Sequence, residues 1–390
     1  MPAVLTANRY SILTLVMGAA VYACSSAPMC PQSNQPSIPS AAPQSTRLEW
    51  YRGNTHTHTL NSDGDATPVA VASWYREHGY QFLVITDHEY LTEVRSLNET
   101  VGGKDKFIVI PGEEVTQEIT DEHHPDGYRE IHINAINPKQ VVHAMGAPFH
   151  DGLGRMAPSG TTVASALAHN IGEIKAAAGI AQVDHPNFRW SIRATDLTNL
   201  PDGTLFEIWN GGHAPINNLG GVDEAGNRAP SAEQLWDILL SQGKHIWAVA
   251  DDDSHDYHNL EDINSMRPGL AWIVVRADQL TAQAITDSIA KGDFYASNGV
   301  VLDDITASDR QLTIRIDPSG SAPILPGWKS DSRFATCFIG KGGRVLAEVG
   351  GLTARYVVRG DEGYVRARIT DSNGRQAWTQ PVFVVGNKSH

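Results

Sequence analysis

The chain has 390 residues, with 44 acidic and 30 basic side chains and a formal net charge of −14. This surplus of negative charge excludes a general basic face for nucleic acid, because the protein would repel the phosphate backbone. Hydrophobic residues make up 41% and charged residues 19%, which is typical of a folded globular chain, and three cysteines exclude a disulfide scaffold. The 16 histidines are the most informative feature, because imidazole is the commonest metal ligand among side chains.

The first 23 residues predict a signal peptide. Arg9 precedes an apolar run at 12–23 that is shorter than the roughly 20 residues a membrane span needs. The run ends in VYAC, where Cys24 resembles the lipidated cysteine of a bacterial lipobox, although Tyr22 departs from the small residue usual there. Residues 24–46 are rich in Ser, Pro, Gln and Ala and predict a flexible tether. We therefore expect an exported protein at the periplasmic face, anchored to the outer membrane only by a lipid on Cys24, or otherwise secreted.

Residues 47–299 alternate between short apolar runs and amphipathic stretches. The alternation favours a parallel α/β barrel or an open sheet. The segments 116–129 and 146–161 are the longest candidate loops. Strands are predicted at 82–86, 107–112, 131–136, 180–184, 205–209 and 246–250, and helices at 68–78, 162–178, 231–242 and 280–291.

From about residue 300 the pattern changes. Short alternating runs such as LTIRID, FATCFI and YVRARITD are separated by Gly, Asp, Asn and Pro, without a stretch of helix length. Residues 300–390 therefore predict a small all-β sandwich domain.

Histidines and carboxylates stand at or near the ends of nearly all the predicted strands. Each cluster alone is compatible with a turn or a helix cap. In parallel α/β folds, however, ligands and catalytic groups gather at the carboxyl ends of strands, so together the clusters predict a metal site. Nitrogen and oxygen ligands without thiolate suit Zn, Mn or Fe and argue against a structural zinc finger. The clusters are His56, His58 and Asp63; Asp87 and His88; Glu113 and Glu114; His132; Asp184 and His185; Glu207; and Asp251, Asp252, Asp253 and His255.

The ordered set HTHT…D, TDH, GxE, H, DHP and DSH resembles the PHP superfamily, named for polymerase and histidinol phosphatase domains. The resemblance covers about residues 48–300. The segments WYRGNTHTHTLNSDGD and ARITDSNGRQAWTQPVFV are most similar to its carbaryl-hydrolase-like branch. The resemblance implies a distorted (β/α)7 TIM-like barrel that holds up to three divalent metals, followed by a β-rich domain.

The resemblance also implies a ligand set. Glu114 matches the family's Gly-x-Glu motif, counted from Gly112, better than Glu113 does, and would bridge two ions. Asp63 stands where some members have His, which leaves the third site's metal and occupancy open. We expect two or three divalent ions of Mn, Zn or Fe. Their ligands would be His56, His58, Glu114 and Asp253 for the first ion; Glu114, His132 and His185 for the second; and Asp63, His88 and His255 for the third.

The expected activity is hydrolysis of a small, anionic substrate. The ions would leave net positive charge in the pocket of an acidic protein, which favours a phosphoesterase using a metal-bridging hydroxide at a di- or trinuclear site. The alternative is hydrolysis of a carboxylic or carbamate ester by the same metals; a non-enzymatic binding module and metal sequestration are further alternatives. Glu207 is a candidate catalytic acid or substrate contact, or else an inward strand residue. Arg267 is a candidate contact for a substrate anion, or else a solvated loop residue.

Overall fold

A computed structural model describes residues 48–103, 106–148, 153–212, 214–223, 226–320 and 333–384. The predicted signal peptide, tether and lipidated Cys24 lie outside the described residues. The chain divides into two units, Met1–Ser45 and Thr46–His390. The described residues all belong to the second unit. Among the described residues, no helix combines the length and the apolar character needed to cross a membrane.

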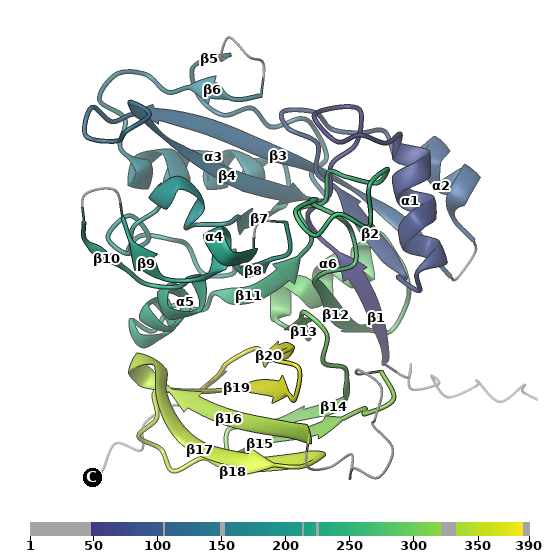
Figure 1. The fold of residues 1–390 in the computed structure, drawn as a ribbon, viewed down its shortest axis with the longest axis vertical. Coiled ribbons are helices and arrows are strands. Elements are labelled where there is room, and N and C mark those ends of the chain that lie inside the picture. The colour runs from purple at the N-terminus through teal and green to yellow at the C-terminus, as the bar shows by residue number, and fades with distance from the viewer. Residues whose placement is uncertain are drawn as a thin grey trace, which may run out of the picture. The chain divides into compact units, whose positions relative to one another are not determined.

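A mixed sheet forms the centre of the α/β part (Figure 1). Its strands follow the order β11-β8-β7-β4-β3-β2-β1-β12-β13. The pairs β1–β2, β2–β3, β7–β8 and β8–β11 are parallel, so the carboxyl ends of these strands lie at one edge. The bounds are β1 Glu49–Asn54, β2 Phe82–Ile85, β3 Ile108–Thr120, β4 Tyr128–Ile136, β7 Ile180–Val183, β8 Leu205–Asn210, β11 Trp247–Asp251, β12 Trp272–Ala277 and β13 Phe294–Ser297.

The expected parallel sheet is not parallel throughout, because β4 runs antiparallel to both β3 and β7, and β12 runs antiparallel to both β1 and β13. The connection from β3 to β4 spans only residues 121–127, whereas a parallel crossover needs a dozen or more. The predicted loop at 116–129 is also wrong at both ends, because β3 continues to Thr120 and β4 begins at Tyr128. Polar side chains on one face of this hairpin hid its strand character.

The helices confirm the predicted amphipathic segments, and their first turns are capped by hydroxyl side chains. Thr67 and Thr281 accept hydrogen bonds from backbone N–H groups of the first turn, and Thr162 and Ser231 form capping boxes. The sequence pattern did not predict α2 or α4. The helices are α1 Pro68–Glu77, α2 Arg95–Val101, α3 Val163–Ala176, α4 Ala214–Asn218, α5 Ala232–Ser241 and α6 Ala282–Lys291.

Apolar side chains from the sheet and from α3 and α5 share a buried core. Val183, Phe206 and Val249 of the sheet share a buried cluster with Leu167 of α3 and Trp236 of α5. Burying a side chain such as Phe206 stabilises the fold by about 1.5–3 kcal/mol. The core fixes the strands whose ends carry the polar residues.

Four short strands and a 3-10 turn lie in the connections. The turn η1 (Phe188–Trp190) follows β7 after residues 184–187 and contributes to the candidate site. The short strands pair as β5–β6 and β9–β10. Their bounds are β5 Ala147–Pro148, β6 Arg155–Met156, β9 Gly221–Val222 and β10 Arg228–Ala229.

The described residues after 300 form strands and one 3-10 turn, η3 (Lys341–Gly343). One sheet has the order β14-β15-β18, and the strands β20-β19-β16-β17 continue the main sheet through β13. Ile314, Phe338 and Ile369 bring both sheets into one apolar cluster. The strands are β14 Leu302–Ala307, β15 Gln311–Ile316, β16 Phe334–Gly340, β17 Arg344–Gly350, β18 Thr353–Val357, β19 Tyr364–Asp371, β20 Gln376–Thr379 and β21 Val382–Phe383.

Hydrogen bonds between the described residues cross the predicted boundary at residue 300. Strand β20 pairs with β13, and the buried guanidinium of Arg366 on β19 makes hydrogen bonds of 2.7 and 2.8 Å to Asp237 of α5. The β-rich part is thus bonded to the α/β part through backbone and side chains.

Candidate metal centre

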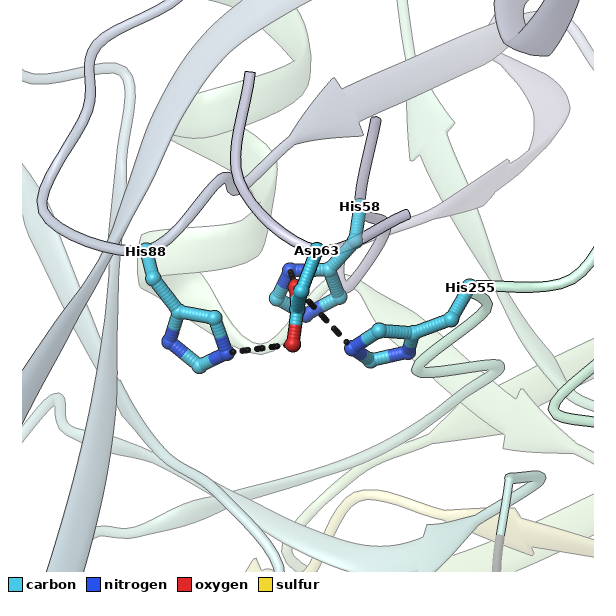
Figure 2. A group of neighbouring side chains, drawn as sticks. All are labelled: His58, Asp63, His88 and His255. Atoms are coloured by element: carbon cyan, nitrogen blue, oxygen red, sulfur yellow. Dashed lines mark ion pairs between the residues drawn. The ribbon is translucent and has the colours of Figure 1, made fainter. Parts of the chain in front are cut away.

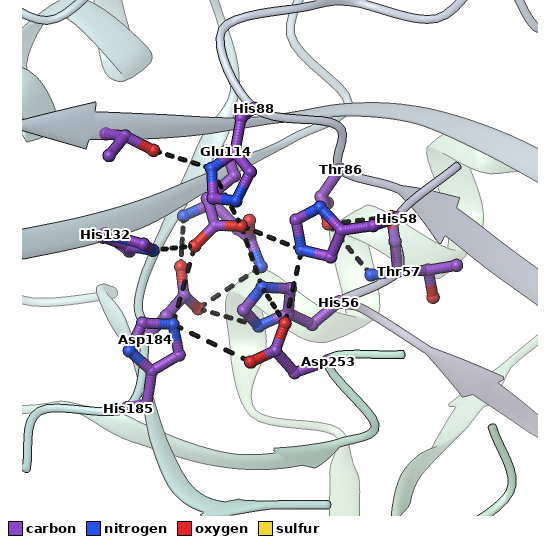
Figure 3. Close-up of polar contacts among 12 residues, drawn as sticks. His56, Thr57, His58, Thr86, His88, Glu114, His132, Asp184, His185 and Asp253 are labelled. Carbon is purple, nitrogen blue, oxygen red and sulfur yellow. Dashed lines mark hydrogen bonds and ion pairs between the residues drawn. The ribbon is translucent and has the colours of Figure 1, made fainter. Parts of the chain in front are cut away.

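The structure brings the nine predicted ligands together at one edge of the main sheet. Strand β3 extends past this edge and returns as β4, so that His132 lies opposite Thr116 on the reversed strand. The other ligands follow the ends of β1, β2, β7 and β11 or lie in β3. They are His56, His58, Asp63, His88, Glu114, His132, His185, Asp253 and His255 (Figures 2 and 3).

The first group unites His56, His58, Glu114 and Asp253, the set predicted for one ion. Their candidate ligand atoms all lie within 4.8 Å of one another. His56 Nε2 lies 3.1 Å from Glu114 Oε2 and 3.2 Å from Asp253 Oδ1. His58 Nε2 lies 3.0 and 3.3 Å from the same two oxygens. Two imidazoles that follow β1, one carboxylate that follows β11 and one carboxylate within β3 thus converge (Figure 3).

The second group combines His58 with Asp63, His88 and His255 (Figure 2). Asp63 Oδ1 lies 3.3 Å from His255 Nε2, and Asp63 Oδ2 lies 3.7 Å from His88 Nε2. The rings of His58 and His255 stack at 4.0 Å. The sequence predicted three of these residues, and the structure adds His58.

The third group differs from its prediction by one histidine. Glu114 Oε1 lies 2.6 Å from His132 Nδ1, and His88 completes the group. His185 was predicted in this place, but its Nε2 lies 3.6 Å from Glu114 Oε1 and 4.0 Å from Asp253 Oδ2. His185 therefore lies beside both the first and the third group.

The carboxylate surplus around His56 fits divalent cations. Five buried carboxylates surround His56. Among the described residues, these carboxylates form ion pairs with imidazoles and not with Lys or Arg. Burying so much negative charge without cations is costly, and nitrogen and oxygen donors suit Zn, Mn or Fe. The carboxylates are Glu114, Asp184, Glu207, Asp251 and Asp253, each at most 5% exposed.

Burial and the carboxylates act in opposite directions on the histidines. Burial lowers the pKa of His88 to about 3, which keeps its imidazole neutral and able to bind a metal. Burial also lowers the pKa of His58, but hydrogen bonds to Asp253 and Glu114 outweigh it and raise that pKa to about 10. Burial raises the pKa of the Asp253 and Glu114 carboxyls, yet the imidazoles around them hold both well below their usual range.

Glu207 lies beneath the ligands and not in the cavity. It is 1% exposed, and Glu207 Oε1 lies 3.2 Å from His56 Nδ1. Its other oxygen accepts a hydrogen bond from the backbone N–H of His185. Asn210 Nδ2 donates to Glu207 at 3.1 Å and to Asp253 Oδ2 at 3.0 Å. This placement agrees with the interpretation of Glu207 as an inward strand residue and does not agree with a substrate contact.

Asp87 and Asp184, which precede ligand histidines, serve different neighbours. Asp87 Oδ1 accepts a hydrogen bond of 2.7 Å from the backbone N–H of Thr59. This bond joins the segment after β2 to the segment after β1. Asp184 Oδ2 accepts the backbone N–H of Asn134 at 2.7 Å, and its Oδ1 lies 3.8 Å from His56 Nδ1. Both stabilise the segments that carry ligands.

A cavity of about 300 Å³ opens onto the cluster. Six of the predicted ligands line it, namely Asp63, His88, His132, His185, Asp253 and His255. Arg267 does not line the cavity, and its Nη1 donates to the carbonyl of Leu260 at 2.8 Å. The remaining lining residues are Glu118, Tyr128, Glu130, Leu153, Phe188, Arg189, Asn217 and Met266.

The sequence reasoning missed Glu130 and Arg189. Glu130 Oε1 lies 3.1 Å from His132 Nε2, and Glu130 Oε2 accepts a hydrogen bond from Arg189 Nη1 at 3.3 Å. The spacing Tyr128, Glu130, His132 has the period of two that places side chains on one face of a strand. That signal was present in the sequence, whereas nothing in the sequence places Arg189 beside Glu130.

No protein-family model matches the sequence, and no curated protein matches it. Several solved structures are similar. A two-domain protein containing a predicted PHP-like metal-dependent phosphoesterase from Bacteroides vulgatus is 13% identical, with 86% of this chain and 96% of that chain covered and a TM-score of 0.40.

Two others are more distant. A putative metal-dependent phosphoesterase from Bifidobacterium adolescentis is 14% identical over 52% of this chain and 87% of its own, with a TM-score of 0.35. A lesion-specific endonuclease from Pyrococcus furiosus is 13% identical over 63% of this chain and 56% of its own, with a TM-score of 0.32. All three TM-scores lie below 0.5.

Proposed function

We propose that the protein is a metal-dependent hydrolase of the PHP superfamily and that it hydrolyses phosphoesters. The observation that carries the proposal is the convergence of nine nitrogen and oxygen donors, in the superfamily's motif order, on one buried cluster beside a cavity. The carbaryl-hydrolase-like branch and the distorted barrel with a separate β-sandwich domain belong to the same proposal.

Two or three divalent ions would be held by the three groups described above, with Glu114 common to two of them. Bound divalent ions lower the pKa of water and neutralise charge on phosphoryl oxygens. The protein's own residues hold the ligands in place: Glu207 bonds His56, and Glu130 bonds His132. Such carboxylate–imidazole pairs fix the tautomer and the orientation of the ring.

The cavity also supplies a cation of the protein's own. Arg189 is the one Lys or Arg among the described residues that line it. Its guanidinium is held by the Tyr128 hydroxyl at 3.0 Å and by Glu130. A planar guanidinium matches phosphate oxygens in geometry, which supports a phosphoester over a neutral substrate.

The second candidate is hydrolysis of a carboxylic or carbamate ester at the same site. It is favoured by the apolar part of the cavity, which includes Leu153, Phe188 and Met266. A neutral ester places no charge against these side chains.

A panel of nitrophenyl phosphate, bis-nitrophenyl phosphate, and nitrophenyl carboxylate and carbamate esters separates the two candidates. The purified protein is assayed with Mn, Fe, Zn or Co, beside His56→Ala and Glu114→Ala. Phosphoester turnover that both substitutions abolish supports the proposal. Turnover of carboxylate or carbamate esters alone supports the second candidate, and absence of phosphoester turnover with every metal contradicts the first.

We also propose that the protein is exported and anchored through Cys24 at the periplasmic face. The support is the sequence of residues 1–46. Mass spectrometry of the mature protein tests it: a diacyl-glyceryl Cys24 as first residue is expected, and an intact residue 1 contradicts export by this signal.

A further inference from the structure

The cavity beside the cluster is lined by two unlike sets of side chains. One set is six of the predicted metal ligands, and the other is aromatic, apolar and amide side chains together with Arg189, Glu118 and Glu130. A volume of about 300 Å³ lies at the small end of the range of small-molecule sites. A phosphoryl group at the cluster therefore leaves room within the cavity for one compact substituent.

Phe188 is an aromatic side chain of the second set, and it lies beside two of the predicted ligands. Its ring centroid lies 5.4 Å from that of His185 and 6.0 Å from that of His132. The leaving group of a phosphoester at the cluster thus meets the Phe188 ring beside these two histidines. An aromatic ring offers a flat apolar face on which another planar group stacks.

Arg189 extends this flat surface. Its guanidinium carbon lies 5.4 Å from the Phe188 ring centroid and 5.9 Å from that of Tyr128. Arg189 Nη1 donates to the Tyr128 hydroxyl and to Glu130, which holds the guanidinium in place. Guanidinium planes stack on planar groups as aromatic rings do.

The backbone that carries this surface is strained and pinned. Arg189 and Trp190 both have φ near +50°, which non-glycine residues rarely adopt. The carbonyl of Arg189 accepts a hydrogen bond of 2.9 Å from the ring of His124, which lies in the loop between β3 and β4. Strain of this kind persists where the surroundings determine the conformation, and it clusters at functional sites.

The protein's own charges around Phe188 disfavour a second anionic group. Glu118 and Glu130 contribute two carboxylates, and Arg189 contributes one guanidinium that is already bonded to Glu130. A leaving group with its own phosphate or carboxylate would lie against these two carboxylates. A neutral leaving group meets no such repulsion.

We infer that the Phe188–Arg189 surface binds a compact, planar, uncharged leaving group, so that the preferred substrate is a phosphomonoester of a small aromatic alcohol. The inference rests on the proposed phosphoesterase function. It assigns Phe188 the role of selecting the leaving group, apart from the residues that hold the metals.

Benzyl phosphate and cyclohexylmethyl phosphate test it, because their leaving groups have similar size and basicity and differ in planarity. The expected kcat/KM is about 3- to 10-fold higher for benzyl phosphate, the range of an aromatic contact. Phe188→Leu should bring the ratio within twofold of one, whereas Phe188→Tyr, which keeps the ring, should retain it. Phe383→Leu, at a residue that does not line this cavity, is the matched control and should also retain it.

Binding of benzylphosphonate and cyclohexylmethylphosphonate to the metal-loaded protein, measured by calorimetry, separates this inference from the proposed function. The same preference in binding without turnover of either ester sustains the assignment of the Phe188–Arg189 surface as a site for a planar group and overturns the phosphoesterase together with its phosphomonoester substrate. Equal turnover of both esters overturns the inference and leaves the phosphoesterase standing. A preference that survives in Phe188→Leu also overturns the inference, and neither binding nor turnover overturns both.

Discussion

Glu207 and His56 form a buried carboxylate–imidazole pair, with Glu207 Oε1 3.2 Å from His56 Nδ1. A carboxylate only accepts, so Nδ1 carries a proton toward Glu207 and Nε2 faces Glu114 and Asp253. Because Glu207 also accepts the backbone N–H of His185, one side chain fixes two predicted ligands from different strands.

Glu207→Gln is therefore expected to weaken metal binding. Loss of such a partner typically costs 10- to 100-fold in metal affinity or activity, and we expect a decrease of about that size in the affinity of the tightest ion. Calorimetric titration of chelator-treated protein measures it, with Glu173→Gln on the exposed face of α3 as control. If Glu207 is instead the leaving-group acid, affinity stays at the wild-type value while kcat falls.

Arg189 and Arg267 are expected to respond differently to substitution. Arg189→Ala removes the guanidinium that lines the cavity and should raise KM about tenfold, the worth of a charge-assisted hydrogen bond. Arg267→Ala removes a loop hydrogen bond to Leu260, lowers the free energy of unfolding by roughly 1 kcal/mol and leaves kcat/KM within twofold. Steady-state kinetics on both variants checks this, and a reversed pattern would restore Arg267 as the substrate contact.

Metal binding is expected to release protons and to strengthen with pH. The pKa of His58 is about 10, because hydrogen bonds to Asp253 and Glu114 outweigh the lowering effect of burial, so the metal competes with a proton near neutral pH. The apparent affinity should rise between pH 6 and 8. Calorimetry in buffers of different ionisation enthalpy measures the protons released, and none released would contradict the assignment of His58.

Glu113 should make stability fall as pH rises. Burial raises its pKa from 4.5 to about 8, and Glu113 Oε2 accepts the backbone N–H of Val142 at 2.8 Å. Between pH 4.5 and about 8, Glu113 is protonated in the folded protein and ionised in the unfolded chain. The contribution of Glu113 to the free energy of unfolding is therefore fully present below pH 4.5 and is lost as the pH rises through about 8.

Glu113→Gln keeps a neutral side chain at every pH and should flatten this fall. Denaturant titrations at pH 5 and pH 9, with metal at a fixed saturating concentration, should show a smaller loss in the variant, by up to roughly 4 kcal/mol. Parallel losses in both proteins would show that Glu113 is ionised throughout.

The sequence predicted the helices and most strands of the α/β part because short apolar runs and capped amphipathic segments are local signals. It predicted the clustering of the ligands for a related reason. His88, His185 and Asp253 follow strand ends closely, and strand ends of one direction meet at one edge.

What the sequence could not supply depends on pairing between distant segments. The reversal of β4 places His132 opposite Thr116, and the turn after β7 brings Phe188 and Arg189 to the same cavity. The sequence left open whether Glu207 is a catalytic acid or an inward strand residue, because the burial of such a residue depends on what packs above it, here His56.

The central claim is that this cluster binds divalent metals, and elemental analysis of the purified protein tests it most directly. Two or three equivalents of Mn, Fe or Zn are expected in the wild type, with lower content in His56→Ala and Glu114→Ala. His78→Ala, at an exposed residue after α1, should keep the full content. No bound metal in the wild type, even after it is added, would contradict the account.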